Sequence, residues 1–219
     1  MSAEIVEDDS QGPVGLRERK KLATRQALAL AAMRLAVEQG VENVLVEDIA
    51  EAAEVSPRTF NNYFSSKYEA ICSLGFDRAL RVGAALRERP ESEDLWQAVV
   101  TAVMSEYGAA AEPLDPEWMA GVRVVTSTPA LRGEYLKVQY MIQYSLADAI
   151  ALRMGHKAAG SMFPRILAAA VAGVVQTVME RWITSDPPVA LAPMMRRGLN
   201  ELADGMLRTL DTHGPTDTG

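Results

Sequence analysis

Apolar residues recur at helical spacing along most of the chain. In the first clear stretch, Leu28, Ala31, Ala32 and Leu35 stand at positions i, i+3, i+4 and i+7, so they share one face of a helix. The sequence contains no run of alternating β-branched residues and no Asn-Gly hairpin signal. This pattern predicts an all-α protein.

Capping residues mark the ends of the expected helices. Ser56 is an N-cap followed by Pro57 at the first helical position, where proline costs no hydrogen bond. Ser66 and Glu69 have the spacing of a capping box, in which each side chain accepts a backbone N–H from the other end of the turn. The signals together predict helices over about 17–39, 46–53, from 57 onward, and over about 66–87, 92–111, 116–127, 129–154, 161–184 and 190–211.

The predicted helices divide into a small head and a larger body. Residues 1–15 are acidic and contain Gly and Pro, which is typical of a disordered tail. We assign residues 16–65 to a three-helix head and residues 66–214 to the body, with the helix 66–87 linking the two. The chain of 219 residues is long enough for this arrangement.

The segment after residue 46 has the pattern of a helix-turn-helix. Two short helices are joined by a three-residue turn, Glu54-Val55-Ser56, and the second helix is polar on its outer side. Arg, Asn and Thr side chains in such a helix can read base edges in the major groove of DNA. The inner side is apolar and comprises Ile49, Ala50, Ala53, Val55 and Phe60. The outer side presents Arg58, Thr59, Asn61, Asn62 and Tyr63.

The charge distribution is uneven. The net charge of −7 argues against a nucleic-acid partner, but the stretch from Leu16 to Arg25 carries five cations and the single anion Glu18. This stretch either contacts phosphates or is simply a solvated start of the first helix. We count Arg17 and Arg25 among the candidate DNA contacts.

The segment from Leu22 to Ile71 resembles the DNA-binding domain of the TetR family of transcriptional regulators. The matching residues are Arg25, Ile49-Ala50, Ala53, Val55-Ser56, Thr59-Phe60, Tyr63-Phe64 and Ser66-Lys67. The resemblance implies an all-helical homodimer with one head per subunit. It also implies that Arg58, Thr59, Asn61 and Asn62 face bases, and that Tyr63 and Lys67 contact phosphates.

Three positions depart from the family pattern. The family often has Thr where this chain has Leu45, Gly where it has Glu54, and Tyr where it has Asn61. We expect the threonine's cap and phosphate contact to be absent or supplied elsewhere. We expect Asn61 to alter base preference without affecting the fold.

The body contains two candidate groups for ligand binding. Trp118, Met119 and Arg123 lie in one helix, and Tyr140, Met141 and Tyr144 lie in the next. Tyrosines with methionines suit an apolar molecule with a polar group, although core packing explains them equally well. Arg123 either meets an intramolecular partner, faces outward, or binds an anionic ligand.

The stretch from Arg123 to Leu136 is also loosely similar to actinobacterial regulators tied to mycofactocin production, a group that responds to acyl-CoA-type molecules. This resemblance suggests an effector with an acyl chain.

The last two predicted helices carry wide apolar faces. The stretch Ile166 to Trp182 is apolar nearly all round, and the final helix has Leu199, Leu202, Met206, Leu207 and Leu210 on one side. Such faces either form a homodimer interface or close a monomeric core.

We therefore expect a ligand-responsive repressor that binds a palindromic operator in double-stranded DNA and is released by a small, largely apolar effector. A protein-interaction module and a helical enzyme are the alternatives, but no nucleophile–base pair, phosphate loop or metal-ligand spacing supports an enzyme. No catalytic residue, metal or cofactor is expected. With no signal peptide visible and no apolar run of about 20 residues, we expect a cytoplasmic protein without a membrane partner.

Overall fold

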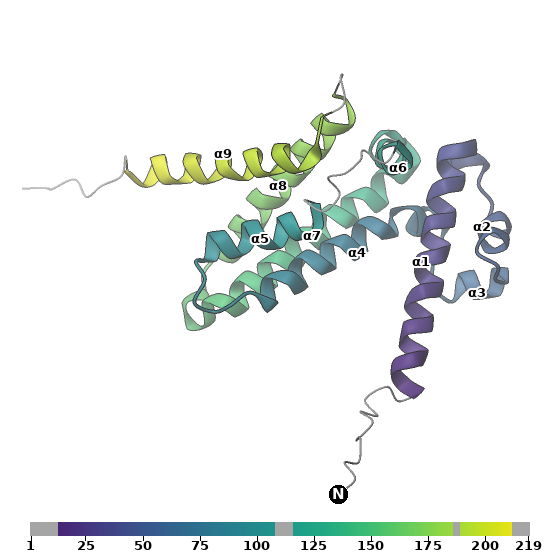
Figure 1. Cartoon of the computed structure of the whole chain (residues 1–219), viewed down its shortest axis with the longest axis horizontal. Coiled ribbons are helices and arrows are strands. Elements are labelled where there is room, and N and C mark those ends of the chain that lie inside the picture. Colours follow the sequence, from purple (N-terminus) through teal and green to yellow (C-terminus); the bar gives the residue numbers. More distant parts are fainter. Residues whose placement is uncertain (1–12, 108–115, 186–188, 212–219) are drawn as a thin grey trace, which may run out of the picture. The chain divides into compact units, whose positions relative to one another are not determined.

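The protein was analysed as a computed structural model, which describes residues 13–107, 116–185 and 189–211, with side chains over 15–107, 119–185 and 189–205. Within these residues the chain forms nine α-helices and three short 3-10 helices, with no β-strand (Figure 1). The predicted all-α class is confirmed. The chain divides into two compact units, residues 1–74 and 75–219, so that the division falls inside one helix.

The head unit begins with a long first helix, which shorter elements follow. Its elements are α1 (Pro13–Gln39), the 3-10 turn η1 (Val41–Asn43), α2 (Val46–Ala52), α3 (Pro57–Asn61) and the start of α4 (Lys67–Glu88). In this unit, η1 and α2 pack against α1, and α3 packs against α2. The apolar positions of these elements converge on one core that excludes water. Its fully buried members include Leu28, Ala32, Ala36, Val44, Ile49, Ala50, Phe60 and Ile71.

Local caps fix where the short helices of the head begin. The Ser56 hydroxyl accepts the Thr59 N–H at 3.1 Å, so the predicted N-cap is confirmed. Half of the predicted capping box is confirmed, because the Ser66 hydroxyl accepts the Glu69 N–H at 3.1 Å. The other half is corrected: the Glu69 carboxylate accepts the N–H and hydroxyl of Ser65, at 2.8 Å and 2.6 Å.

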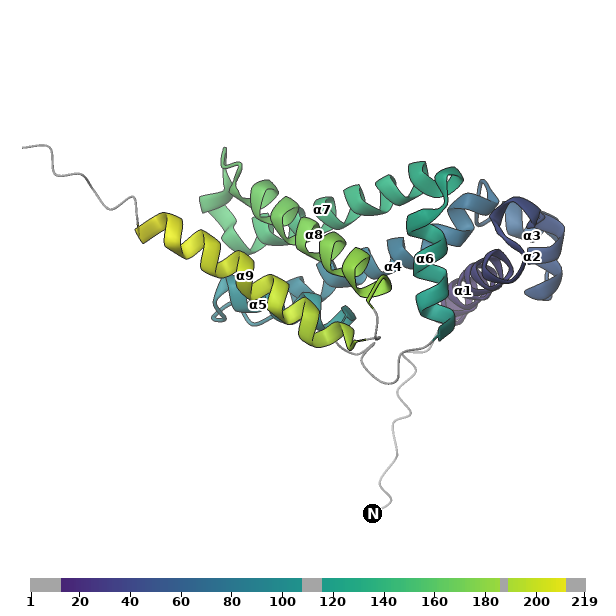
Figure 2. The same ribbon diagram turned by 90° about the horizontal axis from the view of Figure 1, so that it is seen from above.

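The body unit contains the rest of α4 and five further α-helices. These are α5 (Leu95–Tyr107), α6 (Pro116–Ser127), α7 (Arg132–Met154), α8 (Phe163–Ile183) and α9 (Leu191–Asp211), with 3-10 turns η2 (Pro129–Leu131) and η3 (Gly155–Ala158). Helix α8 packs along both α7 and α9, and α9 also contacts α5 (Figure 2). The buried side of α8 therefore lies at the centre of this unit, with Leu167, Ala168, Val171, Val175 and Trp182 among its buried residues.

Two glycines allow helices of the body to approach closely. A Cβ added to Gly83 of α4 would lie 3.1 Å from the Cβ of Ser145 and 3.0 Å from its carbonyl oxygen on α7. A Cβ added to Gly198 of α9 would lie 2.9 Å from methyl groups of both Val174 and Val178 on α8. A Cβ at either position would force its neighbours, Ser145 at one crossing and Val174 with Val178 at the other, to shift, so both crossings favour glycine.

Some helix ends differ from the predicted bounds. Helix α1 begins at Pro13, so residues 13–15, which we assigned to the tail, are helical. Helix α5 begins at Leu95 rather than near 92, because the Asp94 carboxylate accepts the N–H groups of Trp96 and Gln97, at 2.9 Å and 3.2 Å. Residues 1–12 lie outside the described part of the chain.

One described helix, α8, is long and apolar enough to cross a membrane by length and composition alone. Half of its most apolar stretch is buried inside the chain, as in a core helix. Length and composition therefore give only weak evidence for a membrane span.

Candidate functional site

Helix α3 and its C-cap residue Asn62 present three polar side chains at the surface of the head. Arg58, Asn61 and Asn62 are exposed, while Phe60 between them is fully buried and anchors the helix. The helix is only five residues long, so a buried aromatic anchor and the Ser56 cap must hold it in place. Exposed arginine and asparagine side chains on a short, anchored helix suit base-edge contacts in a major groove.

The two other predicted contacts on this segment are half-buried. The Thr59 hydroxyl lies 2.9 Å from the hydroxyl of Ser56, so it shares a hydrogen bond with the cap of its own helix. Tyr63 follows the helix, and its N–H donates to the Phe60 carbonyl at 2.9 Å. A base contact by Thr59 would therefore use its methyl group or a second lone pair of the hydroxyl.

Arg25 lies beside the core of the head. Its guanidinium carbon is 5.1 Å from the centroid of the Phe64 ring, a cation–π distance. The Phe64 ring in turn lies 5.7 Å from that of Phe60, tilted by 45°. Arg25 thus connects the base of the basic stretch to the aromatic pair that anchors α3.

The Lys67 ammonium group has a structural role that the sequence did not predict. Nζ donates to the carbonyl oxygens of Val44 at 2.8 Å and of Glu42 at 3.1 Å. It therefore ties the start of α4 to η1 and to the residue that follows η1. An ammonium has three donors, so one remains for the predicted phosphate contact.

Two departures from the family pattern have visible local effects. Glu54, in the turn between α2 and α3, has a φ of 55°, a conformation that favours glycine. Leu45 is the N-cap of α2 and has no side-chain acceptor, so only the reciprocal bond from the Leu45 N–H to Asp48 forms, at 3.3 Å. The cap that threonine would provide is absent.

The residues predicted to bind a ligand differ in exposure and in their partners. Tyr140 and Tyr144 of α7 are 66% and 60% exposed. Their rings stack on the surface with centroids 6.5 Å apart. The Arg123 guanidinium donates to the Ile183 carbonyl at 3.0 Å, so it caps the end of α8, which is an intramolecular partner. Met119 and Met141 are half-buried, and the Trp118 side chain lies outside the described residues.

Arg78 is a half-buried arginine in the body, with its Nε atom buried, and it was not among the predicted site residues. It lies on α4 and places its guanidinium carbon 5.2 Å from the centroid of the Tyr107 ring. Burial lowers the pKa of Arg78, and the charge of Arg81 lowers it further, while Tyr107 and Glu106 act in the opposite direction. For the Tyr107 phenol, burial acts in the other direction and raises the pKa to about 12. Glu106 accepts from Arg81 at 2.7 Å.

A sequence signal could have revealed this arginine. Gly75, Arg78, Val82 and Leu86 recur at spacings of three or four residues and therefore share one face of α4. Val82 and Leu86 are buried, so Arg78 lies on the core-facing side of its helix, where it is half-buried. A cation on an apolar face is a candidate for recognition of an anion.

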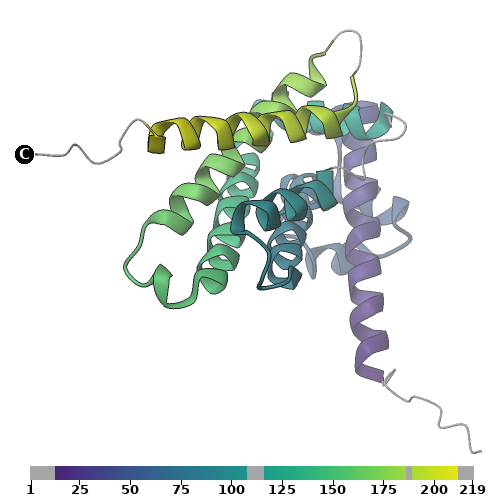
Figure 3. The same cartoon turned by 60° about the vertical axis from the view of Figure 1, so that its left-hand side comes forward.

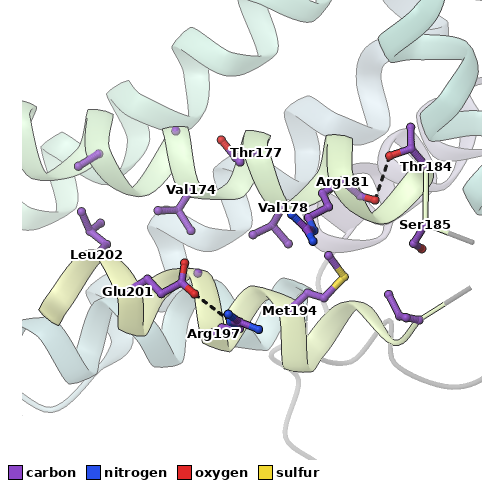
Figure 4. A pocket seen from close by; sticks show the side chains of 14 residues that line it. Val174, Thr177, Val178, Arg181, Thr184, Ser185, Met194, Arg197, Glu201 and Leu202 are labelled. Carbon is purple, nitrogen blue, oxygen red and sulfur yellow. Dashed lines mark hydrogen bonds and ion pairs between the residues drawn. The ribbon is translucent and has the colours of Figure 1, made fainter. Parts of the chain in front are cut away.

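An open groove runs between α8 and α9 (Figure 4). Its volume is about 1110 Å³, and Val174 and Val178 line one side, with Met194 and Leu202 on the other. Gly198 lies at the crossing of the two helices, and the Arg197–Glu201 ion pair, at 2.8 Å, stands at the edge. The groove leaves apolar side chains open to one face of the body.

The fold and the polar face of α3 define a helix-turn-helix DNA-binding protein with a helical C-terminal body. The chain belongs to the TetR family of transcriptional regulators. Residues 28–69 match the bacterial regulatory proteins of the tetR family, and residues 93–207 match the MftR C-terminal domain. As a member of this family it is a DNA-binding regulator of transcription and not an enzyme.

Similar proteins support the assignment of this chain to the TetR family. The HTH-type transcriptional regulator TcmR of Streptomyces glaucescens is 38% identical over 178 residues, which cover 78% of this chain and 77% of that protein. The mycofactocin biosynthesis transcriptional regulator MftR of Mycobacterium tuberculosis is 25% identical over 87% of this chain and 94% of its own. The Thermus thermophilus repressor FadR, solved in complex with lauroyl-CoA, shares the fold with a TM-score of 0.54 at 19% identity, over 89% of this chain and 99% of that one.

Proposed function

We propose that the protein is a homodimeric repressor that binds a palindromic operator and is released by a small, largely apolar effector bound in its body. The observation that carries the proposal is the exposed face of α3, where Arg58, Asn61 and the C-cap residue Asn62 lie beside buried Phe60, which anchors the helix. Arginine pairs with guanine and asparagine with adenine, so this face favours a defined sequence over general DNA affinity. We place the protein in the cytoplasm, where its DNA lies.

The dimer is proposed from the outer face of α8. Ala169, Gly173 and Thr177 are exposed there, and the α8–α9 groove adjoins them. Small residues let two helices approach closely, and an open apolar groove is the kind of surface that a second subunit covers. In a two-fold dimer, two α3 helices would read half-sites about one DNA turn, roughly 34 Å, apart.

The dimer is tested by placing a large cation on this face. We expect Gly173→Arg to be monomeric at micromolar concentrations in size-exclusion chromatography with light scattering. Gly133→Arg is the matched control, because Gly133 of α7 is also exposed and has no neighbour within 4 Å of an added Cβ. A wild-type monomer, or a dimeric Gly173→Arg variant, would contradict the proposed interface.

The effector is proposed to combine an apolar chain with an anionic group. Support comes from the half-buried Arg78, whose guanidinium lies over the Tyr107 ring, and from the lauroyl-CoA bound by the Thermus protein of the same fold. Helix α4 belongs to both units, so an effector that displaces it would act on the head. The six residues named from sequence, Trp118, Met119, Arg123, Tyr140, Met141 and Tyr144, remain predictions.

DNA binding is tested first by selecting bound sequences from a random double-stranded pool with purified protein at a stated salt concentration. We expect an enriched palindrome. If none is enriched before or after bound small molecules are removed, operator binding is contradicted. Release of the protein from the operator is then tested with acyl-CoA, with free CoA as the control. Linkage requires the operator to weaken acyl-CoA binding by the same factor by which acyl-CoA weakens operator binding, typically about 5- to 150-fold.

A further inference from the structure

The first third of α1 extends away from the rest of the head. We call residues 15–23 the α1 arm. Every residue of the arm is exposed, including Leu16 at 47% and Leu22 at 65%, whereas burial in α1 begins at Thr24 and Arg25 and is complete at Leu28. Figures 1 and 3 show this end of α1 running past α2 and α3. Among the described residues of the head, the arm therefore has no packing partner.

The cations of the arm lie on two different faces. Lys21 precedes Leu28 by seven residues, or about two turns, and Arg17 precedes Leu28 by eleven, or about three turns. Both therefore point to the side on which α1 buries Leu28 and carries the short helices of the head. Arg25 continues the same row. Arg19 and Lys20 point to the opposite side and to the flank of the helix.

The charges of the head make this row important for DNA affinity. The outer face of α3 supplies one formal cation, Arg58, and the Lys67 ammonium is held by two backbone carbonyls. By contrast α2 and the turn after it carry four carboxylates: Glu47, Asp48, Glu51 and Glu54. Neutralisation of phosphates supplies most of the sequence-independent affinity for DNA. The helix-turn-helix alone presents an unfavourable charge balance to a polyanion.

We propose that the inward face of the α1 arm, Arg17 and Lys21 with Arg25 at its base, is a second DNA-binding surface that contacts the phosphate backbone beside the α3 site. Three cations in a row span about 12 Å of helix, a length over which a duplex presents several phosphates. The inference rests on the proposed operator binding and adds a partner surface to it. Because phosphates carry no sequence information, the arm contributes affinity and register but not base preference.

The test compares two double variants that remove the same number of charges. Arg17→Gln/Lys21→Gln removes the inward pair, and Arg19→Gln/Lys20→Gln removes the outward and flanking pair. Glutamine keeps good helix propensity, and all four residues are exposed. Both variants should therefore unfold at the same temperature as the wild type. Operator affinity is measured at several salt concentrations, in parallel with an unrelated duplex of the same length.

The inward variant should bind more weakly than the wild type. Its slope of log K against log salt should be smaller by about 0.9 for each phosphate that is no longer neutralised, or about 3.6 for a dimer in which four cations are removed. Binding to the unrelated duplex should weaken by the same factor, leaving the ratio of operator to unrelated affinity unchanged. The slope of the outward variant should fall by less than half as much.

Two results would overturn the inference. Equal weakening in both variants would mean that the cations act only as a diffuse field, and unchanged binding in both would mean that the arm does not meet the backbone. Failure of operator binding itself appears separately, as a wild type that binds both duplexes equally. In that case the comparison of the two variants on the unrelated duplex still shows whether the α1 arm contacts DNA phosphates.

Discussion

The head and the body differ in how far apart in the sequence the residues that determine their structures lie. In the head, the determinants are local: Ser56 caps the helix that Phe60 anchors four residues later, and the polar residues lie beside them. In the body, the determinants are distant in sequence: Gly83 meets Ser145, and Arg78 stacks on Tyr107. A local motif can be recognised from a short stretch, whereas a site assembled from distant helices cannot.

The comparison also concerns the size of mutational effects. Caps and turns at the surface are worth about 1 kcal/mol each. A close helix crossing is worth more, because a single added methyl group must displace a neighbouring helix. Single substitutions should therefore be most damaging in the body where glycines permit close crossings, and mildest at the caps of the head.

The largest effect is expected for Gly83→Ala. The new methyl group would collide with the side chain of Ser145 and approach its carbonyl oxygen to 3.0 Å, which should lower the free energy of unfolding by about 2 kcal/mol. The matched control is Gly133→Ala, also helical but with open space around it, which should gain up to about 1 kcal/mol. Urea unfolding measures both. Equal free energies for the two variants would contradict a close crossing of α4 and α7.

The next effect depends on pH and tests burial of Tyr107. Its pKa is raised from an ordinary 10 to about 12 by burial, so the folded state holds the phenolic proton that the unfolded chain releases. The part of the free energy of unfolding that depends on the protonated Tyr107 phenol is fully present below pH 10 and is lost as the pH rises toward 12. The wild type should lose about 1.4 kcal/mol per pH unit relative to Tyr107→Phe over this range. The difference should be constant between pH 7 and 9; a difference that stays constant up to pH 11 would show an accessible phenol.

A smaller effect separates two cations of the head. Lys67→Met should lower the free energy of unfolding by about 1–2 kcal/mol, since two backbone carbonyls lose a charged donor. It should also lower the salt slope by about 0.9 per subunit, or about 1.8 for the dimer, if the predicted phosphate contact is made. Arg58→Ala should leave stability within about 0.5 kcal/mol and cost about 1–3 kcal/mol of operator affinity, with relaxed sequence preference. Unchanged unfolding of Lys67→Met would mean that its carbonyl contacts contribute nothing.

Much of the fold could be predicted from the sequence, because helix periodicity and caps are local. The helix-turn-helix was found from the residues around Ser56, and the N-cap and the buried position of Phe60 are confirmed. The carbonyl partners of Lys67 could not be predicted, since Glu42 and Val44 lie more than twenty residues away. The base and phosphate contacts themselves stay predictions.

The candidate ligand site shows the limit of periodicity. Tyr140 and Tyr144 lie four residues apart, which places them on one face of α7 but does not say whether that face is buried. They prove to be exposed, whereas Arg78 is half-buried on the core-facing side of α4, a position that was overlooked because arginine is usually a surface residue. Which face of a body helix is covered depends on packing between distant segments, chiefly of α7 and α9 against α8.

The smallest effect is a gain, expected for Leu45→Thr. Threonine would supply the missing acceptor at the start of α2, while the Asp48 carboxylate already accepts the Leu45 N–H, so the reciprocal cap would be complete. Leu45 is 56% exposed, so little burial is lost. Leu45→Val is the control of equal shape without the hydroxyl, and threonine should exceed it by about 1 kcal/mol in thermal unfolding.

The same pair of variants tests DNA binding at this position. If the threonine hydroxyl also donates to a phosphate, as the family pattern implies, Leu45→Thr should raise operator affinity above that of Leu45→Val. The salt slope should not change, because a neutral donor neutralises no phosphate charge and releases no counterion. A gain in stability without a gain in affinity would place the start of α2 away from the DNA backbone. Equal stability of the two variants would show that the cap does not form.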